Sequence, residues 1–171
     1  MADTSTGSVP NSKLLQIDTG ILNVQGACIV LVKTEWNAII TDELERGAIA
    51  ELQIHKVKKI ITVTVPGAVE IPFAIKSFWD NSGAKKRPDA FITLGCVVRG
   101  DTPHFEFVCK AVTDGVVQLN LILPVPTIFG VLTVNNEEQA KERIGGKHGH
   151  KGTEAAITAL KMISLKQTFT K

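Results

Sequence analysis

Four short runs of apolar, largely β-branched residues place the strongest constraint on how this chain can fold. They span Cys28 to Val32, Ile60 to Val65, Ala90 to Val98 and Pro126 to Val134. Each run has the length of a strand and is almost wholly apolar, which is typical of parallel strands that are covered on both faces. The sequence therefore predicts an α/β fold.

Amphipathic stretches between these runs predict the helices. One apolar stripe recurs every four residues and consists of Ile40, Leu44, Ala48 and Leu52. Further helices are expected over Ile71 to Trp79, Val108 to Leu119 and Thr153 to Leu165, with a short one at Glu137 and Glu138 that Asn135 or Asn136 can cap. Because strands and helices alternate, we expect right-handed crossovers and a flavodoxin-like three-layer α/β/α sandwich around a four-stranded parallel sheet.

Composition sets the domain count and excludes several classes of protein. With 171 residues, 44% of them hydrophobic, the chain is long enough for one domain, expected over residues 14–171 after a disordered tail at 1–13. The formal net charge is +2 and the cations are scattered, which argues against a nucleic-acid partner. No apolar run has the length of a membrane span and no signal peptide is visible, so a cytoplasmic protein without membrane contact is expected.

Two features of the chain have simple structural explanations. Cys28, Cys96 and Cys109 cannot all pair, show no CxxC spacing and lie among apolar residues, so we expect reduced core thiols. A four-stranded sheet has edges that need cover, and the segment Leu14 to Ile17 could add a strand to a neighbouring subunit's sheet.

Ligands of open parallel sheets bind beyond the carboxyl ends of the strands, where loops lead into helices. Trp36 follows the first run and could stack on a flat heterocycle, although core packing is the simpler explanation of a lone Trp. Asn37 has a helix N-cap as its default role, and it could also touch a ligand. Gly67 and Ala68 follow the second run and would leave bare N–H groups, while Glu70 suits either the helix dipole or sugar hydroxyls.

The loop after the third run is the most informative one. Asp101 and Thr102 are good cap residues whose N–H groups and hydroxyl can hold an anion, and Pro103 fits the first helical position. His104 follows at the open end of a strand, where an imidazole could transfer protons at neutral pH. A structural role for a lone His stays open.

A basic, glycine-rich stretch runs from Arg143 to Lys151. Its cations suit a phosphate, and a solvated basic loop is the alternative. His148 and His150 alternate, but no Cys or carboxylate lies close by in sequence to complete a ligand set, so no metal site is expected.

Taken together and in this order, these segments resemble the lumazine synthase family over nearly the whole chain, from about Leu14 to Leu165. The segments that carry the resemblance are Glu35 to Asn37, Val65 to Pro72, Leu94 to Glu106, Phe129 to Thr133, Asn136 to Ala140, Arg143, and Lys151 with Gly152. Two positions depart from the pattern, since Trp36 stands where Phe is frequent and His150 where many relatives have Asn.

The resemblance implies a role for each site residue. Trp36 would stack on a pyrimidine ring, which Asn37, Ala68, Val69 and Glu70 would hold together with its ribityl chain. The backbone of Cys96, Val97 and Val98 would bind the ring, Asp101, Thr102 and Arg143 would bind a phosphate, and His104 would transfer protons. Phe129, Arg143 and Lys151 would reach the pocket of the adjacent subunit.

The resemblance also implies the activity. A ribitylamino-pyrimidine condenses with 3,4-dihydroxy-2-butanone 4-phosphate to 6,7-dimethyl-8-ribityllumazine, without redox change and without a cofactor. Family members form pentamers, and some form icosahedral shells, a type that the short connection around Gly146 resembles. Riboflavin synthase is a further partner to consider. One alternative is a flavodoxin-like or receiver-like binding domain, but the loop after the first run has neither the hydroxyl-rich phosphate loop nor the acidic pair of such a domain. A shell protein without activity is the other alternative.

Overall fold

The main sheet of the computed structural model contains four parallel strands in the order β2-β1-β3-β4. They are β1 (Cys28–Thr34), β2 (Lys59–Val65), β3 (Ala90–Val98) and β4 (Thr127–Val134). The structure describes residues 20, 21 and 23–170. The α/β prediction and all four predicted strands are confirmed, with ends within two residues of those expected.

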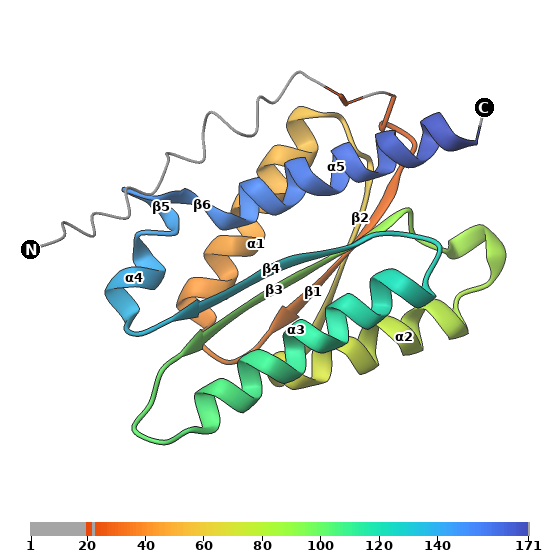
Figure 1. Cartoon of the computed structure of the whole chain (residues 1–171). Coiled ribbons are helices and arrows are strands. Elements are labelled where there is room, and N and C mark those ends of the chain that lie inside the picture. The colour runs from red at the N-terminus through yellow and green to blue at the C-terminus, as the bar shows by residue number, and fades with distance from the viewer. Residues whose placement is uncertain (1–19, 22, 171) are drawn as a thin grey trace, which may run out of the picture.

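Helices cover both faces of the sheet (Figure 1). One face carries α1 (Ala38–Ile54) and α5 (Lys151–Phe169), and the other carries α2 (Ile71–Asn81) and α3 (His104–Ile122). The remaining elements are the 3₁₀ turns η2 (Ala68–Glu70) and η3 (Ala84–Lys86), the short helix α4 (Glu137–Lys141), and the hairpin of β5 (Ile144–Gly146) and β6 (Gly149–His150). The predicted three-layer sandwich is therefore confirmed.

The core consists of two apolar clusters that the sheet separates. Ile29 and Leu31 belong to the cluster beneath α1 and α5, whereas Val30 and Val32 belong to the cluster above α2 and α3. This division follows from the alternation of side chains along a strand, and all four residues are fully buried. A strand buried on both faces is what the apolar runs predicted.

The helical patterns are also confirmed in their main features. The stripe of Ile40, Leu44, Ala48 and Leu52 is buried against the sheet. Asn136 caps α4 by accepting a 2.9 Å hydrogen bond from the Gln139 N–H. The β5–β6 hairpin was not predicted, and the expected tail 1–13 and the segment Leu14 to Ile17 lie outside the described residues.

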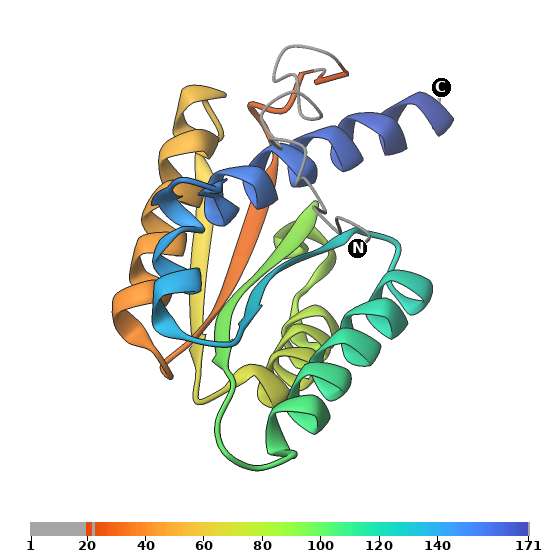
Figure 2. The same ribbon diagram turned by 60° about the vertical axis from the view of Figure 1, so that its left-hand side comes forward.

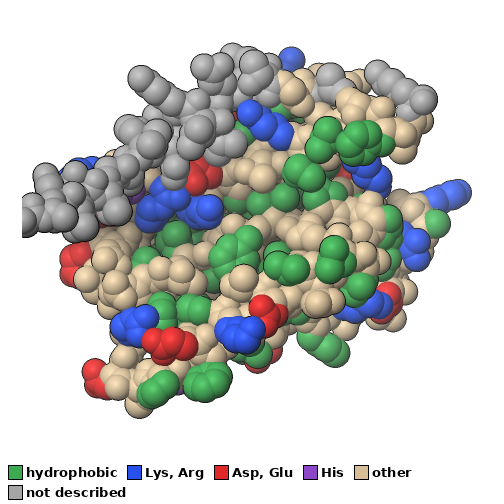
Figure 3. Space-filling view, viewed as in Figure 1, with side chains coloured by type: hydrophobic (Ala, Val, Ile, Leu, Met, Phe, Trp, Pro, Cys, Tyr) green, Lys and Arg blue, Asp and Glu red, His purple; other side chains and the backbone are tan. Residues whose placement is uncertain are grey.

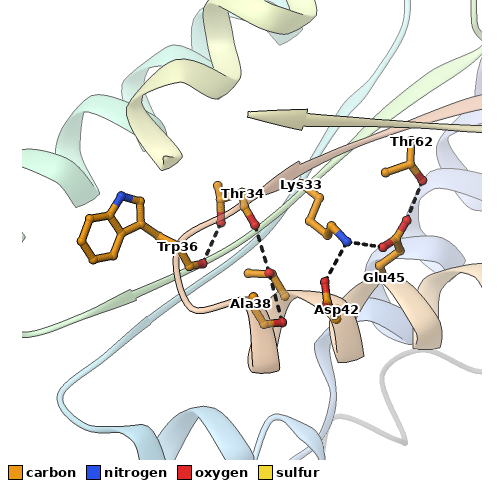
Figure 4. A network of polar contacts seen from close by, with 8 residues as sticks. Lys33, Thr34, Trp36, Ala38, Asp42, Glu45 and Thr62 are labelled. Carbon is orange, nitrogen blue, oxygen red and sulfur yellow. Dashed lines mark hydrogen bonds and ion pairs between the residues drawn. The ribbon is translucent and has the colours of Figure 1, made fainter. Parts of the chain in front are cut away.

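A polar network ties β1, α1 and β2 together near the end of β1 (Figure 4). Lys33 Nζ lies 2.8 Å from Asp42 Oδ1 and 2.5 Å from Glu45 Oε2, and the Thr62 hydroxyl donates to Glu45 Oε1 at 2.6 Å. Burial by itself would lower the pKa of Lys33, but the hydrogen bonds to both carboxylates outweigh it and raise that pKa. The network holds α1 against the sheet just after the loop that begins the site.

Hydrophobic side chains remain exposed on several helices. Phe73 on α2 is 77% exposed, and Phe107 and Leu121 on α3 are 70% and 75% exposed. Figure 3 shows hydrophobic side chains gathered on the face where β4 runs between α3 and α5. Exposed apolar area of this kind is typical of surfaces that bind another protein chain. Over the described residues, none of the helices combines the length and hydropathy that a membrane crossing needs.

Replacing Lys33 by Met should destabilise the fold, because the mostly buried carboxylate of Glu45 would lose the cation that neutralises it. We expect a loss of about 2 kcal/mol in the free energy of unfolding, between the values for exposed and fully buried pairs. Urea unfolding measures it. The matched control is Lys76→Met, whose pair with Asp80 is about half exposed and should change stability by less than about 0.5 kcal/mol. Equal effects of the two variants would contradict the role given to the network.

Candidate functional site

The carboxyl ends of the parallel strands bring three loops to one edge of the sheet (Figure 2). Backbone hydrogen bonds fasten the first loop to the second, and the start of the third loop to the end of β4. The Glu35 N–H donates to the Val65 carbonyl at 2.9 Å, and the Trp36 N–H donates to the Pro66 carbonyl at 3.3 Å. The Arg99 N–H donates to the Val134 carbonyl at 2.9 Å, so the exit of β3 is joined to that of β4.

The side chain of Trp36 lies on the surface at this edge. It is 72% exposed, so the core-packing explanation is wrong for this chain. Figure 4 shows the indole projecting away from the polar network of β1. A Cβ built on Gly67 would lie 3.6 Å from Trp36 Cδ1 and 3.0 Å from Glu70 Oε2. The indole and the carboxylate therefore flank the same glycine, with a flat apolar surface beside a hydrogen-bond acceptor.

Asn37 joins the first loop to β3. Its backbone is left-handed, with φ 59° and ψ 45°, and it stands at the N-cap position of α1. The expected side-chain cap is wrong, because the amide Nδ2 donates instead to the Cys96 carbonyl at 2.8 Å. The Thr41 hydroxyl donates to the Thr34 carbonyl at 3.0 Å, and the Thr34 hydroxyl donates to the Trp36 carbonyl at 3.3 Å. These bonds fix the loop that carries the indole.

The second loop leads through η2 into α2. Gly67 is extended there, with φ −147° and ψ −179°. Ala68 is buried, whereas Val69 is 47% exposed and Glu70 is exposed. The turn thus keeps its small residue inside and presents the next two side chains outward, next to Trp36.

The last residues of β3 have an open edge on the β1 side. Pairing with β1 ends at Lys33 and Leu94, whereas pairing with β4 continues to Val98. Within the described ranges, no strand covers the β1 side of Cys96 to Val98, and Asn37 takes up the Cys96 carbonyl. Burial, with a smaller effect from Glu137, raises the pKa of the Cys96 thiol to about 11. The thiol is therefore mostly protonated at neutral pH, which makes it a poor nucleophile.

The third loop carries Asp101, Thr102 and His104, all of them exposed. Helix α3 begins at His104, one residue later than expected, so that Pro103 occupies the cap position and not the first helical position. The Thr102 hydroxyl accepts from the His104 N–H at 3.4 Å. An anion-accepting helix start and an imidazole therefore lie side by side.

Arg99 supports this loop, and sequence reasoning missed it. Its Nε donates to Asn135 Oδ1 at 3.0 Å, its guanidinium pairs with Glu106, and it lies 4.2 Å from the centre of the Phe105 ring. The hydrogen bond from Arg99 lowers the pKa of Glu106. One partner follows β4 and the others lie in the first turn of α3, so their meeting at Arg99 depends on how the third loop folds.

The basic stretch folds as a second group of site candidates around the β5–β6 hairpin. Arg143 Nη2 lies 2.9 Å from Glu154 Oε2, and Lys151 Nζ lies 3.8 Å from the same oxygen. The Lys151 N–H donates to the Arg143 carbonyl at 2.8 Å. One carboxylate thus holds both predicted cations. Glu154 was also missed, although its spacing of three from Lys151 on a helix is a usable signal.

The structure does not connect all predicted residues within one chain. Among the described residues, no hydrogen bond or ion pair joins Arg143 or Lys151 to the loops after β1, β2 and β3. Phe129 is half-buried in the first half of β4, away from its carboxyl end, and packs against the cluster of α2 and α3. In that same part of the chain, no three His, Cys, Asp or Glu side chains are grouped as a metal site requires.

Comparisons with known proteins agree on one family. The family model described as 6,7-dimethyl-8-ribityllumazine synthase matches residues 26–167. Proteins of that name from Parabacteroides distasonis and Porphyromonas gingivalis are 47% identical over 138 residues and 45% identical over 169 residues. The first match covers 80% of this chain and 84% of the Parabacteroides protein. The second covers 98% of this chain and 95% of the Porphyromonas protein. The chain therefore belongs to the 6,7-dimethyl-8-ribityllumazine synthase family.

Proposed function

We propose that the carboxyl edge of the sheet is the active site at which this chain performs the condensation of its family. The reaction joins 5-amino-6-(D-ribitylamino)uracil to 3,4-dihydroxy-2-butanone 4-phosphate, called the keto-phosphate below, and yields 6,7-dimethyl-8-ribityllumazine in riboflavin biosynthesis. The observation that carries the proposal is the exposed indole of Trp36, held beside Glu70 by a hydrogen-bonded loop.

The pyrimidine binds between the first two loops. Trp36 stacks on the ring, because an exposed indole offers a flat face to a heterocycle. Ala68 and Val69 line the adjoining surface, and Glu70 accepts hydrogen bonds from the ribityl hydroxyls. Asn37 has its amide N–H on Cys96 and keeps its oxygen for the ligand. The open edge of Val97 and Val98 supplies backbone groups to the ring.

The keto-phosphate binds at the third loop. The start of α3, a helix of 19 residues, attracts an anion through its N–H groups and dipole. Asp101 and Thr102 hold the phosphate there through backbone N–H groups and the hydroxyl. His104 then moves protons to and from the reacting atoms, which contributes about 10²–10⁴-fold to the rate.

The chemistry consists of additions and eliminations that need mainly correct placement. The 5-amino group attacks the ketone and water leaves to give an imine, after which phosphate is eliminated. Tautomerisation precedes attack of the ribitylamino nitrogen on the remaining carbonyl, and loss of water closes the ring. Holding the two reactants together can supply up to about 7–11 kcal/mol of the barrier reduction.

A second subunit completes the site. Phe129, Arg143 and Lys151 lie apart from the three loops in one chain, so a neighbouring copy would bring its own set. The exposed rings of Phe73 and Phe107 give such a copy an apolar surface to cover. A head-to-tail contact of this type closes into a ring, which fits a pentamer and, from pentamers, an icosahedral shell that could associate with riboflavin synthase.

The stacking role predicts different outcomes for two substitutions of Trp36. Trp36→Ala should raise KM for the pyrimidine about tenfold or more, in line with the loss of one base–aromatic stack. Trp36→Phe keeps a ring and should stay near the parent value. Steady-state fluorescence of the lumazine product measures both. Because the indole is 72% exposed, thermal unfolding should be nearly the same in all three proteins, and a pyrimidine KM in Trp36→Ala equal to the parent's would refute stacking.

The phosphate role predicts that Arg143→Ala raises KM for the keto-phosphate by about 10- to 100-fold, as expected for a lost charge-assisted hydrogen bond. KM for the pyrimidine should stay near the parent value. Lys166→Ala removes a cation from the far end of α5 and serves as the control. An unchanged keto-phosphate KM in Arg143→Ala excludes this role.

A shared site predicts complementation between two weak variants. His104→Ala should lower kcat about 10²–10⁴-fold without abolishing it. Co-expressed with Arg143→Ala in mixed rings and assayed at keto-phosphate concentrations below the parent KM, it should regain roughly a quarter of the parent activity, because one interface in four then pairs an intact His104 with an intact Arg143. Activity of the mixture no higher than the average of the two variants would show that each chain completes its own site.

A further inference from the structure

We propose that His150 is a positioning residue that seats the basic hairpin on α1 by capping α5 and packing against Gly47, and that this seating holds Arg143 and Lys151 in the geometry that binds the keto-phosphate. The inference rests on the phosphate role proposed above for these cations. It concerns a residue that the functional assignment leaves without a task.

The backbone of His150 lies between the two cations. His150 is the last residue of β6 and pairs with Ile144, which directly follows Arg143. The next residue, Lys151, begins α5 and donates its N–H to the Arg143 carbonyl at 2.8 Å. A displacement of His150 is therefore passed to both cations through the backbone.

The imidazole occupies a space that two glycines leave open. A Cβ built on Gly47 of α1 would lie 2.0 Å from His150 Cε1, and one built on Gly152 of α5 would lie 3.1 Å from the same atom. The Gly152 Cβ would also lie 2.0 Å from the Leu44 carbonyl oxygen, so the two helices approach closely here. The side chain of His150 is 16% exposed. The ring thus acts as a wedge between α1 and α5.

Hydrogen bonding fixes the orientation of the ring. His150 is the N-cap of α5, and its Nδ1 accepts from the Thr153 N–H at 3.3 Å. Its Nε2 is buried 3.5 Å from Glu43 Oε1. The hydrogen bond from Arg46, with a smaller contribution from His150, lowers the pKa of Glu43. The cap bond and the contact with Glu43 therefore hold the ring in one orientation.

The cap chemistry identifies the conservative replacement. Asn places a side-chain oxygen where it can accept from the third helical N–H, and it is among the best N-cap residues. Ala offers no acceptor and leaves the space beside Gly47 empty. Asn at position 150 should therefore keep the hairpin seated, whereas Ala should release it.

The first experiment separates positioning from a general loss of structure. In the assembled enzyme, His150→Ala should raise KM for the keto-phosphate about fivefold, because a smaller fraction of hairpins is in the binding geometry. The pyrimidine KM and kcat should stay within about twofold, and His150→Asn should restore the parent keto-phosphate KM. A decrease confined to kcat, or equal changes in both KM values, would overturn the inference.

Arg143→Ala, measured in parallel, distinguishes the positioning role of His150 from the phosphate role of Arg143. If it raises the keto-phosphate KM while His150→Ala leaves it unchanged, the positioning role fails and the phosphate site stands. If Arg143→Ala leaves that KM unchanged, the phosphate role fails, and the inference built on it fails as well.

A double-mutant cycle tests the wedge itself. Gly47→Ala should raise the keto-phosphate KM as His150→Ala does, because the new methyl group displaces the imidazole. In the His150→Ala background the imidazole is gone, so Gly47→Ala should not raise the keto-phosphate KM any further. Gly83→Ala, where an added Cβ meets no atom within 4 Å, is the control and should leave all constants unchanged. Additive effects of Gly47→Ala and His150→Ala would refute a wedge.

Discussion

Parallel pairing of β1 with both of its neighbours is the constraint on which the site depends. Because β1 lies between β2 and β3, its exit loop can bond to both sides, through the backbone to the start of the loop after β2 and through Asn37 to β3 itself. The strand is buried on both faces, so its register is firmly set. The hydrogen bond from Asn37 to β3 holds the loop after β1 in place and so fixes the orientation of the neighbouring indole.

Two kinds of interaction thus build the two halves of the site. The three loops at the carboxyl edge are fastened mainly by backbone hydrogen bonds and short side chains, which hold position with little loss of side-chain entropy. The basic half depends on one carboxylate, Glu154, shared by two cations on a short hairpin. Such a hairpin has few buried contacts of its own, so its geometry is set by the helices on which it rests.

The layers of the fold could be predicted from the sequence because they follow from local periodicity. The stripe of Ile40 and Leu44 and the cap at Asn136 illustrate this, since each depends on residues a few positions apart. The exposure of Trp36 and the left-handed backbone of Asn37 could not be predicted, because both are decided by contacts with β2 and β3. Trp36, Glu70 and His104 were singled out by their places at strand ends, whereas Cys96 and Val97 came from family resemblance alone. Their roles in binding and catalysis are predictions.

The buried thiol of Cys96 has a consequence for how the protein tolerates oxidants. Burial raises the pKa of this thiol to about 11, so the thiolate is a minor form at pH 7. Peroxide and alkylating reagents attack the thiolate, so this buried sulfur near the end of β3 should react slowly with them. Labelling chemistry can therefore be directed at an introduced surface cysteine in preference to position 96.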